Sequence, residues 1–91
     1  MKVNICGVPH EIIECESTFD TDLHMGQITY GEAKIKINKN LAKPIRVVTL
    51  IHEWIHGALV MLGYNDYAND EQFVQAMAAA INGSFDIRLE E

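Results

Sequence analysis

A long helix that is apolar on almost every side constrains how this chain of 91 residues can fold. Pro44 is typical of a first helical turn, the pattern from there to Leu62 is helical, and Gly63 is a typical helix stop. At about 100° per residue, apolar side chains cover two opposite faces: Val48, Ile51, Ile55, Ala58, Leu59 and Leu62 on one, and Val47, Leu50, Trp54 and Met61 on the other. We expect such a helix at the centre of the fold, covered on both sides.

One polar stripe interrupts this apolar surface, and it consists of Arg46, Thr49, His52, Glu53 and His56. Buried polar groups must be paired, so the stripe requires an explanation. Because they are four residues apart on a helix, His52 and His56 project from one face and are close enough to bind one metal ion. The alternative is that both are core histidines hydrogen-bonded to neighbouring groups.

Glu53 follows His52 and lies about 100° further round the helix, where it can reach a metal-bound water without being a ligand. The residues at 52–56 thus form an HExxH arrangement, which supplies two zinc ligands and a general base. Bound zinc lowers the pKa of its water toward ~7 and polarises a carbonyl group. We therefore expect one Zn²⁺ per chain, with Glu53 accepting a proton from water and returning it to a leaving amine.

A catalytic zinc needs a third protein ligand and one open position. Glu71 is expected in the first turn of the next helix, and a helix that folds back beside the first would aim it at the histidines. Asp70 suits helix capping or a contact to a histidine. Asp66, in the connecting loop, and His24, in a loop at 17–25, are weaker candidates. We predict Glu71 as the third ligand.

Four other side chains are candidates for supporting contacts. Gln75 lies one turn after Glu71 and can orient that carboxylate, although a solvated glutamine is an equal alternative. Tyr30, Tyr64 and Tyr67 can each hydrogen-bond the oxyanion that forms during hydrolysis. Half-buried tyrosines without such a role are common, so each has a structural interpretation as well.

The chain divides into a sheet half at 1–40 and a helical half at 41–91, within a single domain that spans residues 1–91. Alternating apolar residues predict one hairpin over 1–16 with its turn at 7–10, and a second hairpin over 26–38. Such strands favour a sheet with one buried and one wet face.

A second helix is predicted from 70 to 82, with Asn69 as its N-cap and Gln72 as a capping-box partner. The predicted fold class is therefore α+β. It comprises a small antiparallel sheet of two N-terminal hairpins, packed on two C-terminal helices, with the zinc site between the helices.

The charge and composition of the chain limit the kinds of partner that it can bind. The formal net charge of -6 argues against nucleic acid, because phosphate binding requires a basic surface. Charged and polar residues interrupt the longest apolar region, at 45–62, so we expect no membrane span. Without an export signal we expect a cytoplasmic protein, in which Cys6 and Cys15 stay reduced and unpaired. His10 is expected to be a solvated turn residue.

The motif at 52–56, with Glu71 opening the next helix, resembles the gluzincin-like metallopeptidases. Small size and N-terminal strands bring it closest to the ImmA/IrrE-like group, in the short versions carried by bacteriophages and their bacterial hosts. The resemblance implies hydrolysis of a peptide bond, with His52, His56 and Glu71 as zinc ligands and Glu53 as base. It also implies a strand, at 33–38, that lies over the site as an edge for an extended peptide or protein substrate.

Three other readings fit the same motif. One is a phage-type binding or regulatory module that binds zinc without turnover, and another is an inactive metallopeptidase homologue. A purely structural zinc is the third, and it requires a fourth protein ligand such as Asp66 or His24.

Overall fold

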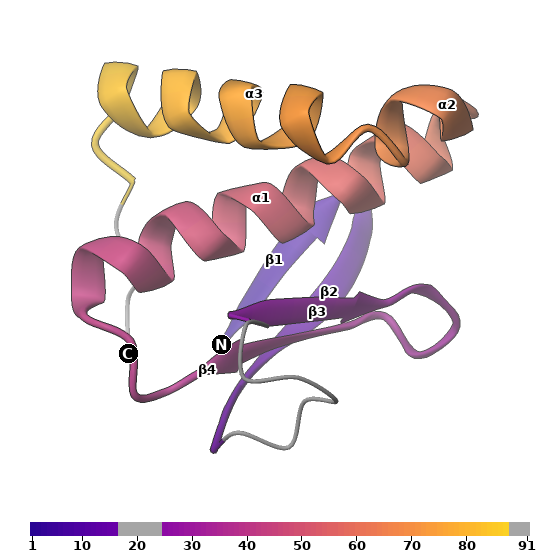
Figure 1. Ribbon diagram of the computed structural model, residues 1–91. Helices are drawn as coiled ribbons and strands as arrows, with labels where there is room; N and C mark the ends of the chain where they lie inside the picture. Colours follow the sequence, from indigo (N-terminus) through magenta and orange to yellow (C-terminus); the bar gives the residue numbers. More distant parts are fainter. Residues whose placement is uncertain (17–24, 88–91) are drawn as a thin grey trace.

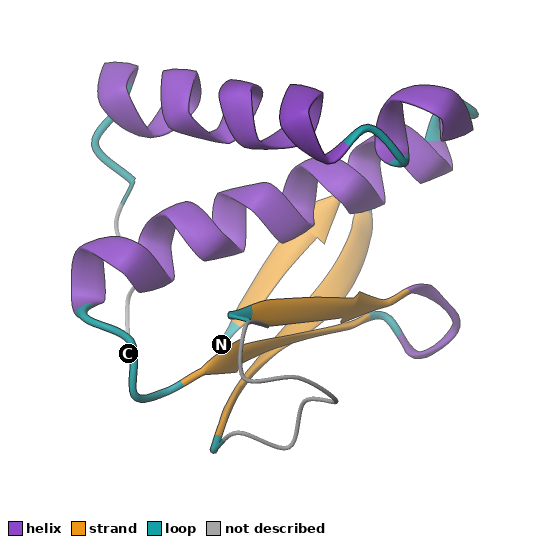
Figure 2. Cartoon of the chain, in the orientation of Figure 1, coloured by secondary structure: helices purple, strands orange, loops and turns teal. Residues whose placement is uncertain are grey.

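The computed structural model describes residues 1–16 and 25–87 (Figure 1). The His24 candidate and most of the loop at 17–25 lie outside these residues. Four strands, one 3-10 turn and three helices follow one another along the chain (Figure 2): β1 (Lys2–Ile5), β2 (Val8–Cys15), β3 (Gly26–Thr29), η1 (Tyr30–Glu32), β4 (Lys34–Asn38), α1 (Lys43–Met61), α2 (Asn65–Ala68) and α3 (Glu71–Ser84). The predicted α+β class is confirmed.

The four strands form one sheet in the order β1-β2-β4-β3. The two predicted hairpins are present, since β1 pairs antiparallel with β2 and β3 pairs antiparallel with β4. The sheet as a whole is mixed, however, because β2 and β4 run parallel, so the prediction of an antiparallel sheet was wrong at this junction. Alternation in a sequence reports which face a residue occupies, and it does not report which strand lies beside it.

The first hairpin turns earlier than predicted. Its two-residue turn is at Cys6 and Gly7, which both have positive φ (49° and 83°), as a type I′ turn requires. The predicted turn at 7–10 was therefore wrong, and His10 lies within β2 instead of in solvent. Only 2% of His10 is exposed, and its Nδ1–H donates a 2.9 Å hydrogen bond to the Val8 carbonyl oxygen. Cys6 is a free, exposed thiol.

Helix α1 lies between the sheet and α3, as Figure 1 shows. Toward the sheet it buries Leu50 and Ala58 against isoleucines of three strands; toward α3 it buries Val47, Ile51 and Ile55 against Val74 and Ala78. The prediction of a central helix covered on both sides is confirmed. Two further contacts fix α1 on the sheet: Arg46 pairs with Glu14 of β2 at 2.8 Å, and the Trp54 indole N–H donates to the Asn4 carbonyl oxygen of β1 at 2.9 Å.

The end of α1 turns the chain back on itself. Gly63 adopts a left-handed conformation (φ 87°), and the Tyr64 N–H donates a 2.8 Å hydrogen bond to the Leu59 carbonyl oxygen. This is a Schellman-type stop, and glycine adopts it without a steric penalty. The predicted Gly63 stop is thus confirmed. The segment after it, predicted as a loop, contains the short helix α2.

Helix α3 begins one residue later than predicted. Asp70, and not Asn69, is its N-cap, because the Asp70 carboxylate accepts a 3.0 Å hydrogen bond from the Phe73 backbone N–H. Glu71 is therefore the first helical residue. In the described ranges, no helix combines the length and apolar character that crossing a membrane demands.

Candidate metal centre

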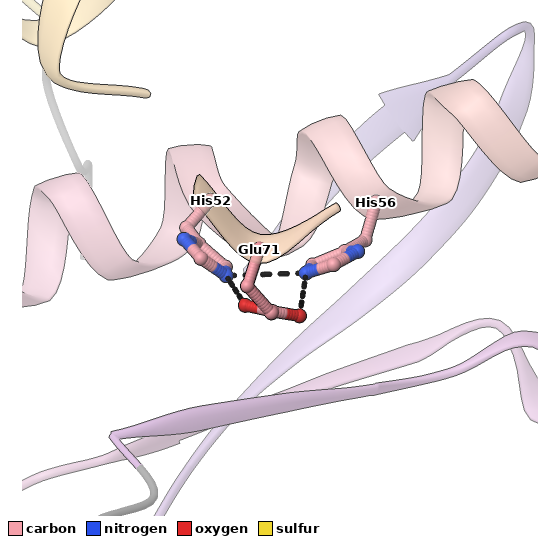
Figure 3. Close-up of side chains that lie close together, drawn as sticks. All are labelled: His52, His56 and Glu71. Carbon is pink, nitrogen blue, oxygen red and sulfur yellow. Dashed lines mark hydrogen bonds and ion pairs between the residues drawn. The ribbon is translucent and has the colours of Figure 1, made fainter. Parts of the chain in front are cut away.

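Three side chains from two helices meet at one point (Figure 3). His52 and His56 project from α1 with their Nε2 atoms 3.1 Å apart. The Glu71 carboxylate, from the first turn of α3, lies against both: one oxygen is 3.1 Å from Nε2 of His52, and the other is 2.9 Å from Nε2 of His56. The predicted set of three ligands is thus brought together in space, in a group that can bind a metal ion.

The separations among these three residues fit one small metal ion. In a tetrahedral site with metal–ligand bonds of about 2.0–2.1 Å, two ligand atoms lie about 3.3–3.4 Å apart. The two Nε2 atoms are 3.1 Å apart, and one ligand atom from each of the three residues lies within 4.8 Å of the others, so a modest rearrangement of these side chains accommodates an ion. Two imidazole nitrogens and a carboxylate suit zinc and also other divalent transition metals, so the donor set alone does not select the metal.

Gln75 fixes the orientation of one imidazole. The Nδ1–H of His52 donates a 2.8 Å hydrogen bond to Oε1 of Gln75, one turn beyond Glu71 on α3. This bond places the proton on Nδ1 and leaves the Nε2 lone pair directed toward Glu71 and His56. Metal-binding histidines are commonly held in this way. Gln75 was predicted to orient Glu71, and its partner is instead His52.

Glu53 lies beside this group without belonging to it. Its side chain is buried, with 9% exposed, and it lines the same cavity as the histidines. Burial raises the pKa of Glu53 from 4.5 to about 7; His52 acts against this rise, and Glu71 adds to it. A carboxylate with a pKa near neutrality is well matched to accepting and returning a proton.

The cavity over these residues has a volume of about 560 Å³, which is in the range of ligand-binding pockets. Its walls come from α1, from the start of α3 and from the outer strand β3. The lining comprises 25–28, Tyr30, Val48, Thr49, His52, Glu53, His56, Ala68, Asn69, Glu71 and Gln75. The strand that borders the site is therefore β3, and the strand implied at 33–38, now β4, is interior to the sheet.

The three candidate tyrosines occupy two different places. Tyr30 lines the cavity of the metal group, and its pKa is raised by burial first and then by the negative charges of Glu53 and Glu71. Tyr64 and Tyr67 line a second, smaller depression, where their rings are 6.1 Å apart and Tyr67 packs against Phe73. The structure therefore brings Tyr30 to the site, and it does not bring Tyr64 or Tyr67 there.

Two other ligand candidates, Asp70 and Asp66, do not belong to the metal group. Asp70 caps α3, in agreement with one of its two predicted roles. Asp66 lines the second depression beside Tyr64 and Tyr67. Within 1–16 and 25–87, the potential metal-binding group contains three residues, so this part of the chain supplies no fourth ligand.

Gly26 and Thr49 line the cavity but were not predicted as site residues. Thr49 belongs to the polar stripe, so its position follows from the same helical periodicity as that of His52 and Glu53. Gly26 was assigned only to a hairpin strand. A glycine inside a strand pattern can mark a close approach of another segment, and this was the available signal.

Searches of known protein families, of curated proteins and of solved structures found no match to this chain. The function must therefore be inferred from the geometry of the site.

Proposed function

We propose that this protein is a zinc-dependent peptidase that resembles the gluzincin-like, ImmA/IrrE-type enzymes. One observation supports this proposal above all: Glu53, a buried carboxylate, shares a cavity with the group formed by His52, His56 and Glu71. Among the described residues, the three ligands leave one coordination position for water or substrate, as a catalytic zinc site requires. We further propose that it acts in the cytoplasm of a bacterium, where it can be encoded by a phage.

Each of the site residues has a distinct chemical role in the proposed hydrolysis. His52, His56 and Glu71 hold the zinc ion, which when bound activates water and polarises the substrate carbonyl. Glu53 accepts the proton of the attacking water and returns it to the amine that leaves. Burial raises the pKa of Glu53 in the metal-free protein, and the positive charge of bound zinc would act in the opposite direction. Gln75 keeps the His52 imidazole in the tautomer that binds metal through Nε2.

The outer edge of β3 provides a place for an extended peptide. The Asn38 N–H donates a 2.9 Å hydrogen bond to the Met25 carbonyl oxygen. In an antiparallel pair, every second residue of a strand is hydrogen-bonded to its partner strand, so residues 27 and 29 are the next ones bonded to β4. The backbone groups of Gly26 and Ile28 then point away from β4, toward an edge that borders the cavity and is free of a neighbouring strand among the described residues. A peptide substrate that adds to this edge lies across the metal ligands.

Tyr30 is the tyrosine suited to stabilise the oxyanion of the transition state. It lies on the cavity wall, and its pKa is raised first by burial and then by the charges of Glu53 and Glu71. A phenol O–H directed at the developing negative charge lowers the energy of the transition state more than that of the bound substrate. It replaces Tyr64 and Tyr67 in this role.

The experiment compares wild type with Glu53→Gln after both are loaded with zinc. Zinc content is measured by elemental analysis, and hydrolysis is followed on a mixture of peptides by mass spectrometry. Glu11→Gln, on the exposed face of β2, serves as the control. We expect one zinc per chain in all three proteins, with hydrolysis lost only in Glu53→Gln.

Two results would contradict the proposal. Equal hydrolysis by wild type and Glu53→Gln would show that Glu53 is not the general base. Stoichiometric zinc without hydrolysis of any peptide in the mixture would instead favour a zinc-containing binding module or an inactive homologue.

A further inference from the structure

Gly26, the first residue of β3, lies unusually close to α1. A Cβ atom at this position would be 2.7 Å from Cγ2 of Thr49, 3.2 Å from the Lys36 carbonyl oxygen and 3.4 Å from Cγ of Glu53. The last distance is an ordinary van der Waals contact, whereas the first is shorter than real Cβ contacts allow. Only glycine therefore fits between α1 and β4 at this point.

The groups around Gly26 cannot easily move away. Thr49 is 5% exposed, and a β-branched side chain in a helix has restricted rotation about its first side-chain bond. The Lys36 carbonyl belongs to the backbone of β4, which is paired with strands on both sides. An added methyl group would consequently displace β3 from α1.

This close approach occurs at the catalytic part of the cavity. Thr49 and Glu53 are one helical turn apart and share a face of α1. Together with Gly26 they line the cavity that contains His52 and His56. The backbone of Gly26 also belongs to the free edge of β3. The distance between that edge and Glu53 is thus set where Gly26 meets Thr49.

We propose that Gly26 is a positioning residue: its contact with Thr49 sets how closely a peptide bound on the β3 edge approaches Glu53 and the metal ligands. This inference depends on the proposed peptidase function for its kinetic consequence. Its geometric part, that Gly26 places the docking edge, is independent of turnover.

The test begins with zinc-loaded wild type, Gly26→Ala and Gly83→Ala. Gly83 lies near the end of α3, where an added Cβ would meet nothing within 4 Å, so Gly83→Ala is a matched glycine control. Two zinc-chelating probes are compared: acetohydroxamate, which needs no strand, and a tripeptide hydroxamate, whose backbone needs the β3 edge. Hydrolysis of the best peptide substrate is measured in parallel.

For Gly26→Ala we expect zinc content and acetohydroxamate affinity to match wild type. Tripeptide hydroxamate affinity and kcat/KM should each fall about tenfold or more, because a displacement of about 1 Å at a catalytic site can reduce rate by ~100-fold. Gly83→Ala should match wild type throughout. Retention of tripeptide hydroxamate binding and kcat/KM by Gly26→Ala would overturn the proposal.

The second arm repeats the comparison in a Thr49→Ser background, which removes the Cγ2 atom that a Cβ at residue 26 would meet. We expect Gly26→Ala to lower tripeptide hydroxamate affinity less there than in the wild-type background, because the Cγ2 contact is removed while the approach to the Lys36 carbonyl oxygen remains. An equal loss in both backgrounds would refute the role of the Thr49 contact. If Gly26→Ala alone does not fold, the double variant must fold and bind the tripeptide hydroxamate more tightly than acetohydroxamate, or the proposal fails.

Different results contradict the peptidase proposal and the proposed role of Gly26. A wild type that hydrolyses no peptide contradicts the peptidase assignment, while the hydroxamate measurements still decide the role of Gly26. A wild type that does not bind the tripeptide hydroxamate more tightly than acetohydroxamate contradicts docking on the β3 edge, and with it the role of Gly26.

Discussion

The Nδ1–H of His52 donates a 2.8 Å hydrogen bond to Oε1 of Gln75. This bond crosses from α1 to α3 one helical turn from Glu71, so α3 contributes both a candidate ligand and a support for the candidate ligand His52. A metal site built in this way depends on the two helices lying side by side, which the buried contacts of Val74 and Ala78 with α1 maintain.

Gln75→Ala should weaken zinc binding, because the His52 imidazole loses the partner that fixes its tautomer and orientation. Removal of such a partner typically costs about 10–100-fold in metal affinity. Affinity is measured by competition with a chromogenic chelator. Gln72→Ala, an exposed glutamine on the same helix, should retain wild-type affinity. Equal affinities in the two variants would show that Gln75 does not support the site.

The metal-free protein should lose stability as pH rises from about 4.5 to about 7. Glu53 has a folded-state pKa of about 7 against 4.5 for the ordinary group, so in this window the folded protein retains a proton that the unfolded chain has released. Stability from this group is therefore present below pH 4.5 and is lost once the pH exceeds 7. The loss is on the order of 3 kcal/mol, at about 1.4 kcal/mol for each pH unit in the window.

Glu53→Gln isolates this effect, because glutamine cannot release a proton. Urea unfolding of both proteins at pH 5 and pH 8, in the presence of a chelator, measures the difference. The variant should be more stable than wild type at pH 8, and this advantage should shrink at pH 5. A difference that does not change with pH would mean that Glu53 is not the titrating group.

Asp70→Ala should destabilise the metal-free protein by about 1 kcal/mol, since loss of an N-cap side chain has this typical cost. The substitution removes the hydrogen bond from the Phe73 N–H to the Asp70 carboxylate. Asp70 directly precedes Glu71, the candidate third ligand. Thermal unfolding measures the effect, and Asp66→Ala, which removes an acid from the short helix α2, is the comparison. An unchanged melting temperature in Asp70→Ala would contradict the assigned cap.

Tyr30→Phe should lower kcat by roughly a hundredfold, the scale observed when one oxyanion donor is removed. KM and zinc content should change little, because the contact is made in the transition state. Tyr67→Phe should have wild-type kcat, as Tyr67 packs on Phe73 outside the cavity. A normal kcat in Tyr30→Phe would show that the Tyr30 hydroxyl does not stabilise the transition state.

The helical half of the fold was predictable because helical periodicity links sequence spacing directly to a face. The central position of α1, its stop at Gly63 and the side-by-side placement of His52 and His56 all follow from residue spacing. The sheet was less predictable. Each strand showed an alternating pattern, but the parallel pairing of β2 with β4 depends on packing between segments distant in sequence.

The site shows the same division. Local spacing identified the two histidines, and a helix that folds back was enough to suggest Glu71. Three features needed the tertiary structure: the bond from His52 to Gln75, the presence of Tyr30 in the cavity, and the contact of Gly26 with Thr49. Each joins elements whose relative placement no local pattern specifies.

Zinc stoichiometry in purified wild type and in Glu71→Ala tests the metal centre most directly. Glu32→Ala, which removes another glutamate from the exposed turn η1, is the control. The geometry of His52, His56 and Glu71 predicts one zinc per chain in wild type and in the control, and loss of most of the zinc from Glu71→Ala. Equal zinc in all three proteins, or none in wild type, would contradict the assignment of this group as a zinc site.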